Sequence, residues 1–281
     1  MKKHNREGIA NRSYLVYLPT LAFVLFAVFP VYWMLVTSLQ RGDNLYTWPP
    51  RLLPDLSQLA VLKRLFATQP IGLWLKNSLI VSLGVACLSI LLAIPAAYGF
   101  SRFKFRGSLL IQLLLLLTQM IPSTVIIVPL FILFRQVHLL NTYISLILAD
   151  AALIAPVSVW ILKAFFDTIP KGIEEAALID GCNRLDVLRR ITLPLAVPSV
   201  VAAFAISFFE AWNEFAFALT FAGDQQMWVS SVGMASWIGW LTTPVEIMMS
   251  GAVVFTIPSV LLFLVLQRQL ISGLAAGAVK Q

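Results

Sequence analysis

The stretch "EEAALIDGCNRLDVLRRITLPLAVP", from Glu174 to Pro198, is a charged, amphipathic segment in a chain that is otherwise strongly apolar. The runs on either side of it, 142–166 and 196–221, are long and apolar. Such runs suit a lipid bilayer, because about 20 apolar residues in a helix cross its hydrocarbon core. The stretch therefore indicates a polar helical element between two membrane spans.

Composition places the whole chain among integral membrane proteins. Of its 281 residues, 59% are hydrophobic and 12% are charged, whereas a soluble domain carries about 25% charged residues. The net charge of +7 does not indicate a nucleic-acid partner, because no basic patch is interleaved with aromatic residues. Two distant cysteines and two isolated histidines suggest neither a disulfide framework nor a metal site.

The hydropathy pattern predicts an all-α, polytopic fold in which residues 1–281 form a single transmembrane domain. Each predicted span has 24 or more residues, which is enough to cross about 30 Å of hydrocarbon. Most spans contain a proline, which kinks a helix and is tolerated in membranes where neighbours satisfy the freed carbonyls. The six predicted transmembrane helices cover residues 14–39, 74–100, 109–134, 142–166, 196–221 and 247–270.

The distribution of lysine and arginine predicts the orientation in the membrane. If the N-terminus is cytoplasmic, 14 of these residues lie on the cytoplasmic side and 6 on the other. Because lysine and arginine are enriched in cytoplasmic loops, both termini are predicted to be cytoplasmic. The polar loop 167–195, between the fourth and fifth spans, then lies in the cytoplasm as well.

The first half of this loop predicts a short helix. Pro170 suits its first turn, and Ile173, Ala176 and Ala177 recur at a spacing that gives one apolar face. Gly181 is able to take the left-handed conformation that ends a helix. The two small alanines leave room for a partner to approach closely.

The second half predicts another short helix, with Asn183 as its N-cap and Pro194 as its end, since the residue before a proline avoids helical geometry. A helix, glycine turn and helix outside the membrane suit the docking of a soluble partner. The alternative is an amphipathic loop that lies on the lipid surface with its arginines on phosphates.

These residues carry a family resemblance. Glu175-Ala176-Ala177, three residues, Gly181, nine residues and then Ile191-x-Leu193-Pro194 resembles the EAA motif of ABC importer permease subunits. "FFEAWNEFAFAL", from Phe208 to Leu219, and the tail "QRQLISGLAAGAVK", from Gln267 to Lys280, are similar to the maltose-type branch of carbohydrate importers. The count of six spans resembles the smaller of the two permease subunits in that branch.

The resemblance implies a function and a set of partners. In that family the EAA loop forms a coupling helix that sits in a cleft of a cytoplasmic ATPase dimer. It also implies a second homologous permease subunit, an extracytoplasmic solute-binding protein and a place in the bacterial inner membrane. The implied ATPase-coupling residues are Glu174, Glu175, Ala176, Ala177, Asp180, Gly181, Ile191, Leu193 and Pro194.

ATP hydrolysis is not expected in this chain. It has no G-x-x-x-x-G-K-[ST] loop to hold phosphates and no Gly-Lys dipeptide at all. We therefore expect no cofactor in the chain, with ATP and magnesium bound by the partner ATPase, and we expect that the chain is not itself an enzyme.

Polar residues inside the predicted spans indicate a substrate pathway, because charges in a membrane helix usually face a cavity or a partner. Glu210 and Glu214 are four residues apart and are predicted to share one helix face. Sugars need hydrogen-bonding groups and an aromatic surface. The candidate pathway residues are Gln119, Ser123, Glu210, Trp212, Asn213 and Glu214.

Other interpretations of these residues stay open. Interhelical hydrogen bonds are the alternative role, and they are the favoured one for Asp150. An ion-coupled secondary transporter could use Asp150, Glu210 or Glu214, although such folds usually show internal repeats that are not seen here. A membrane scaffold without transport activity is a third hypothesis.

Overall fold

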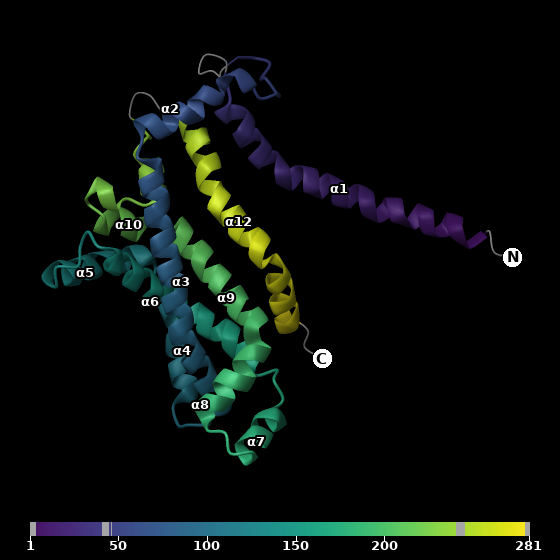
Figure 1. The fold of residues 1–281 in the computed structure, drawn as a ribbon, viewed down its shortest axis with the longest axis vertical. Helices are drawn as coiled ribbons and strands as arrows, with labels where there is room; N and C mark the ends of the chain where they lie inside the picture. The colour runs from purple at the N-terminus through teal and green to yellow at the C-terminus, as the bar shows by residue number, and fades with distance from the viewer. Residues whose placement is uncertain (1–3, 41–44, 46, 240–244, 279–281) are drawn as a thin grey trace. The chain divides into compact units, whose positions relative to one another are not determined.

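The computed structural model describes residues 4–40, 45, 47–239 and 245–278 (Figure 1). These residues are all-helical, and they contain no strand. A π-helical turn covers Leu188–Thr192, and short 3₁₀ turns cover Leu56–Leu59 and Gln225–Met227. The α-helices are α1 (His4–Ser38), α2 (Ala60–Thr68), α3 (Ile71–Arg102), α4 (Ser108–Thr118), α5 (Ser123–Gln136), α6 (Tyr143–Phe166), α7 (Lys171–Ile179), α8 (Arg184–Val187), α9 (Leu193–Asn213), α10 (Ala216–Phe221), α11 (Ser230–Ala235) and α12 (Val245–Ala278).

The predicted all-α membrane class is confirmed. Five helical segments are each long and apolar enough to cross a bilayer, and a bent pair of helices makes up to six. The five unbroken segments are Tyr17–Ser38, Ile71–Arg102, Tyr143–Phe166, Arg184–Asn213 and Val245–Leu270.

The third predicted span, 109–134, is not one continuous helix. It divides into α4 and α5, which meet at an angle of 96°. Pro122 lies at the break with ψ of 132°, outside the helical region, and it lacks the N–H that would continue the helix. The Gln119 side-chain amide donates to the Leu153 carbonyl of α6 at 2.9 Å. The break is therefore attached to a neighbouring span.

The fifth predicted span begins earlier than expected. Pro194 does not end the second short helix, because α8, the π-helical turn and α9 run on as one segment, Arg184–Asn213. The Leu193 N–H reaches the Leu188 carbonyl, five residues back. We attribute the continuation to this wider turn, which accommodates a proline ring that has no N–H to donate.

The same span also ends earlier than expected. The helix stops at Asn213, and Glu214 takes an extended backbone with ψ of 136° before α10 begins. The Glu214 carboxylate accepts the backbone N–H groups of Phe217 at 2.7 Å and Ala218 at 3.0 Å. Glu214 therefore caps α10 and does not continue the helix, although it lines one cavity together with Glu210.

The structure divides into two compact units, whose described residues lie within 1–70 and 237–256 for one unit and within 71–236 and 257–281 for the other. In the second unit α3, α6 and α9 pack against one another (Figure 1). Ser158 of α6 and Ser207 of α9 share a buried hydrogen bond of 2.9 Å. Small side chains let membrane helices approach closely. The fully buried ones include Ala86, Ala93, Ala97, Ala196, Ala203 and Ala205.

The two ends of this helical trio carry different attachments. At the start of α3, Asn77 donates to the carbonyls of Gln226 at 2.8 Å and Trp228 at 2.9 Å. Gly233 of α11 lies so close to the Trp74 ring that an added Cβ would come within 2.2 Å of it. The other end of α3 contacts the segment that contains α7. The polar loop and α11 therefore lie at opposite ends of the trio.

The first unit contains α1, α2 and the first part of α12. Within it the Ser250 hydroxyl donates to the Ser38 carbonyl at 3.3 Å, which joins the end of α1 to α12. Most apolar side chains between Tyr17 and Leu35 are exposed. This surface is available to lipid or to another subunit.

Candidate functional site

The helix α7 ends in a well-defined glycine turn. Gly181 has φ of +89°, the left-handed conformation that the sequence predicts. The Cys182 N–H bonds the Ala177 carbonyl at 3.0 Å, and the Gly181 N–H bonds the Leu178 carbonyl at 3.2 Å. These two bonds form a Schellman motif, which satisfies carbonyls at the end of the helix. The direction of the chain after α7 is therefore fixed by its backbone.

The predicted cap of the next helix is confirmed. The Asn183 side-chain oxygen accepts the backbone N–H of Asp186 at 2.9 Å, at the start of α8. Helix, glycine turn and capped helix follow in the predicted order. The first helix begins at Lys171, with Pro170 as the preceding cap residue rather than its first helical residue.

The predicted apolar face of α7 differs from the one observed. Ile173 and Ala176 are exposed, and Ala177 is buried beside Glu174. Glu174 is only 2% exposed, whereas Ile179 is 85% exposed. We call Glu174 and Ala177 the inner face of α7. We call its four exposed residues at helical spacing, Gly172, Glu175, Ala176 and Ile179, the outer face.

The Glu174 carboxylate is buried because three side chains donate to it. Its Oε2 atom accepts Arg102 Nε at 2.9 Å and the Tyr98 hydroxyl at 3.4 Å. Its Oε1 atom accepts the Thr192 hydroxyl at 2.8 Å. A buried charge is tolerated when it is paired and hydrogen-bonded. Glu174 therefore replaces an apolar residue on the inner face without leaving an unpaired charge.

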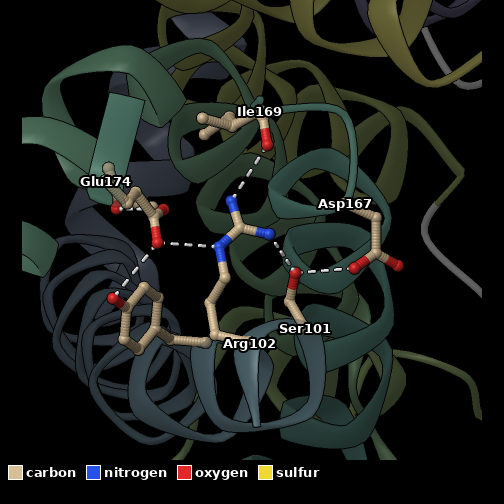
Figure 2. Close-up of polar contacts among 7 residues, drawn as sticks. Ser101, Arg102, Asp167, Ile169 and Glu174 are labelled. Carbon is tan, nitrogen blue, oxygen red and sulfur yellow. Dashed lines mark hydrogen bonds and ion pairs between the residues drawn. The ribbon is translucent and has the colours of Figure 1, made fainter. Parts of the chain in front are cut away.

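Arg102 extends this network to the connection between α6 and α7 (Figure 2). Its Nη2 atom donates to the Ile169 carbonyl at 3.2 Å, and its Nη1 atom donates to the Ser101 hydroxyl at 2.8 Å. The Ser101 hydroxyl in turn donates to Asp167 at 2.6 Å. The end of α3 thus holds the chain on both sides of the α7 N-terminus.

The remaining predicted coupling residues lie around this arrangement. Asp180 is exposed and forms the C-cap of α7. Ile191 lies in the π-helical turn, and Leu193 and Pro194 begin α9. These three are not on α7 itself but in the helical segment that follows it.

A cavity of about 320 Å³ lies farther along α6 and α9. Four of the six predicted pathway residues line it, namely Gln119, Ser123, Glu210 and Glu214. Asp150 of α6 lines it as well, and its Oδ1 atom has no hydrogen-bond partner among the described residues. The interhelical hydrogen bond favoured for Asp150 is therefore not observed at that atom.

The other two predicted pathway residues do not line this cavity. Trp212 is buried and stacks on Phe208, with ring centroids 5.5 Å apart. The Asn213 side chain is exposed and donates to the Phe209 carbonyl at 2.7 Å.

The cavity wall has three carboxylates, two uncharged polar residues and five apolar residues. Among the described residues that line it, none is lysine, arginine or histidine.

Comparison with known proteins agrees with this architecture. Residues 89–275 match the family of binding-protein-dependent transport system inner membrane components. The chain belongs to this family. It is a multi-pass inner-membrane permease of a binding-protein-dependent ABC importer, and ATP hydrolysis resides in a separate subunit. The family predicted from the EAA motif is confirmed.

Several relatives of the permease are similar over nearly its whole length. It is 35% identical to the sulfoquinovosyl glycerol transport system permease protein SmoH of Agrobacterium fabrum, over 90% of this chain and 89% of that protein. It is 34% identical to the trehalose/maltose transport system permease protein MalG of Thermococcus litoralis, over 98% of this chain and 99% of that protein.

A solved structure shares the permease's fold. It is a bacterial ABC transporter involved in the import of the acidic polysaccharide alginate, and one of its chains superposes with a TM-score of 0.75 at 19% identity. The superposition covers 95% of this chain and 98% of that chain.

Sequence reasoning missed the partners of Glu174. In the sequence Arg102 contributes only one of the positive charges that predict orientation, yet in the structure its side chain is 4% exposed. Thr192 lies within the motif at an unspecified position, and Tyr98 is one of many aromatic residues in the spans. The one signal in the sequence is the pair Glu174-Glu175, since successive residues of an α-helix point in directions about 100° apart.

Proposed function

We propose that the permease is one of two homologous membrane subunits of an importer for a sugar or sugar derivative. The names of SmoH and MalG, which refer to saccharides, support this class of cargo. In this proposal residues 1–281 form one permease domain. Its partners are a second permease, a cytoplasmic ATPase dimer that binds ATP and magnesium, and an extracytoplasmic solute-binding protein.

The outer face of α7 supports docking to the ATPase, and it is the observation that carries the proposal. Ile179 is 85% exposed, on a helix whose turn and following cap are both fixed by hydrogen bonds. A large apolar side chain presented in this way suits an apolar cleft in a partner. Glu175, Ala176 and Asp180 are exposed around it. We assign docking to these residues and assign the turn to Gly181.

The motif residues after α7 have a different proposed part. Ile191, Leu193 and Pro194 lie where the loop becomes a span. Because α8 and α9 belong to one continuous segment, force applied to the loop reaches the span without passing through a flexible link. We infer that these residues move together with the docked loop and do not contact the ATPase themselves.

The orientation follows from the charge distribution. With 14 lysines and arginines on one side and 6 on the other, both termini and α7 are assigned to the cytoplasm. The segment 222–230, at the opposite end of the helical trio, is then assigned to the side of the solute-binding protein.

The cavity between α6 and α9 is the proposed pathway. Ligand sites are concave, mostly apolar and equipped with a few convergent polar groups. Gln119, Ser123, Glu210 and Glu214 meet that description together with Asp150. Carboxylate and amide oxygens accept hydrogen bonds from sugar hydroxyl groups. Trp212 and Asn213 are assigned to helix packing instead.

The proposed cargo and its pathway are tested by transport measurements. The test is reconstitution into liposomes. The permease would be purified with its partner subunits, and uptake would be measured for the sugar that the cognate binding protein binds. We expect uptake that requires ATP and the binding protein. Failure of the complete transporter to take up that sugar, with ATP and the binding protein present, would contradict the proposal.

A further inference from the structure

The docking role of α7 leaves the purpose of its inner face unexplained. Glu174 lies on that face and is 2% exposed, so it is not available to a partner. We propose that Glu174 is a positioning residue that ties the docking helix to two membrane spans, with Arg102 as its countercharge. This inference rests on the proposed docking function, because it concerns how movement of the docked helix reaches the membrane.

The contacts of Glu174 join α7 to two other elements. From α7, its carboxylate accepts Arg102 Nε of α3 at 2.9 Å and the Thr192 hydroxyl of the π-helical turn at 2.8 Å. The Tyr98 hydroxyl of α3 adds a third contact at 3.4 Å. A displacement of α7 must therefore either carry the ends of α3 and α9 with it or break these bonds.

Arg102 adds further bonds between the end of α3 and the chain around the N-terminus of α7. The ion pair is almost completely buried, with side-chain exposures of 4% for Arg102 and 3% for Glu174. The same guanidinium donates to the Ile169 carbonyl, just before α7, and to the Ser101 hydroxyl (Figure 2). Five donor groups in a planar fork let arginine hold several acceptors in fixed directions.

One of the two spans that Glu174 joins, α9, lines the candidate pathway, and the other, α3, packs against it. α9 carries Glu210 to the cavity, and α6, which packs against both α3 and α9, carries Asp150 to it. Movement that enters at α7 is thus applied to the helical trio around the cavity. Contiguous packed helices and buried polar networks are the physical means by which distant sites are coupled.

A purely stabilising role is the competing explanation. Removing one partner of a buried ion pair is destabilising, whereas replacing both partners by apolar residues is often neutral. The apolar pair would restore packing but could not donate to Ile169 or accept from Thr192. Stability and coupling are therefore separable by comparing single and double variants.

The experiment uses the complete transporter, purified with its ATPase and placed in lipid. The variants are Glu174→Gln, Arg102→Met and the double variant R102M/E174M. Asp186→Asn is the matched control, because it neutralises a carboxylate of the same loop whose ion pair with Arg190 is far less buried, with side-chain exposures of 32% for Asp186 and 76% for Arg190. The readouts are thermal stability of the complex and the ratio of ATPase rates with and without the binding protein.

We expect Glu174→Gln to lower this ratio at least about fivefold, a typical coupling between two sites. Asp186→Asn should leave the ratio unchanged. The double variant should recover thermal stability without recovering the ratio. Recovery of both by the double variant, failure of the double variant to assemble, or a normal ratio in Glu174→Gln would overturn the proposal.

A distance measurement provides a readout that does not depend on hydrolysis. Spin labels at Lys171 and Lys104, both exposed, report the separation of α7 from the end of α3 after Cys87 and Cys182 are replaced. We expect a narrow distribution that Glu174→Gln broadens, and an unchanged width would count against the tie. The docking proposal fails separately, if Ile179→Asp still binds the ATPase.

Discussion

Two adjacent glutamates of α7 have opposite environments. Glu174 is buried and paired with Arg102, and Glu175 is exposed on the outer face. Neither charge pattern nor spacing in the sequence separates them, since the decisive interaction comes from a residue 72 positions away. Removing one partner of such a buried pair costs about 3–5 kcal/mol. Glu174 therefore affects the stability of the loop as well as its position.

Gly181 provides the sharpest test of the loop's turn. We expect Gly181→Val to insert into the membrane and to lose ATPase binding or stimulation, because a β-branched residue is strained at φ of +89°. No atom lies within 4 Å of an added Cβ, so the effect comes from the backbone alone. Gly181→Asn is the control, since asparagine tolerates this conformation. Transport by Gly181→Val at the wild-type rate would disprove the role assigned to the turn.

Gly233 is required for a different reason. Its added Cβ would overlap the fully buried Trp74 ring at 2.2 Å. We expect Gly233→Ala to destabilise the permease by about 1–3 kcal/mol through overpacking, measured as loss of monodispersity on heating. Gly72→Ala is the control, because no atom lies near its added Cβ. Similar melting of the two variants would show that α11 is free to move away from α3.

At the scale of elements, the sequence predicts the spans well and their ends less well. Long apolar runs identify membrane helices because the bilayer requires satisfied backbone groups over a fixed length. Turn residues depend on their surroundings instead. Pro122 breaks a span, whereas Pro194 follows a π-helical turn inside one continuous helical segment. The neighbouring residues in the sequence do not distinguish the two prolines.

The end of α9 shows the same limit. Glu214 leaves the helix and uses its carboxylate to cap α10, although its sequence neighbourhood is consistent with a continuous span. Four pathway candidates nevertheless meet at one cavity, because a polar residue in an apolar run must find water, a donor or a cavity. Trp212 and Asn213 do not need a cavity, since an indole can pack in a core and an amide can bond the backbone of its own helix.

The orientation of the elements is directly testable. In a cysteine-free background, a cysteine at Arg106 should resist a membrane-impermeant reagent applied from outside, and one at Gln225 should react. Both positions are exposed, and they lie near opposite ends of the α3–α6–α9 trio. The reverse pattern of labelling would show that the charge distribution does not set the topology.

In the molecule as a whole, one unit of the chain contains the docking surface, the buried connection and the cavity. The acidic cavity predicts that Glu210→Ala lowers sugar uptake by the assembled transporter, because its carboxylate faces the pathway. Asn213→Ala, three residues along the same helix but outside the cavity lining, is the matched control. Uptake would be measured in proteoliposomes with size-exclusion of each complex. Equal loss in both variants, or dissociation of both complexes, would assign Glu210 to helix packing.

The most direct test of the central claim is co-purification of the ATPase with the permease. In our proposal the outer face of α7 docks this partner, and Ile179 is its most exposed apolar side chain. We predict that the wild-type permease retains the ATPase through affinity purification and size-exclusion chromatography. Ile179→Asp should lose it while keeping its own elution position, because a charge is then placed in an apolar contact. Full retention of the ATPase by Ile179→Asp would contradict the account.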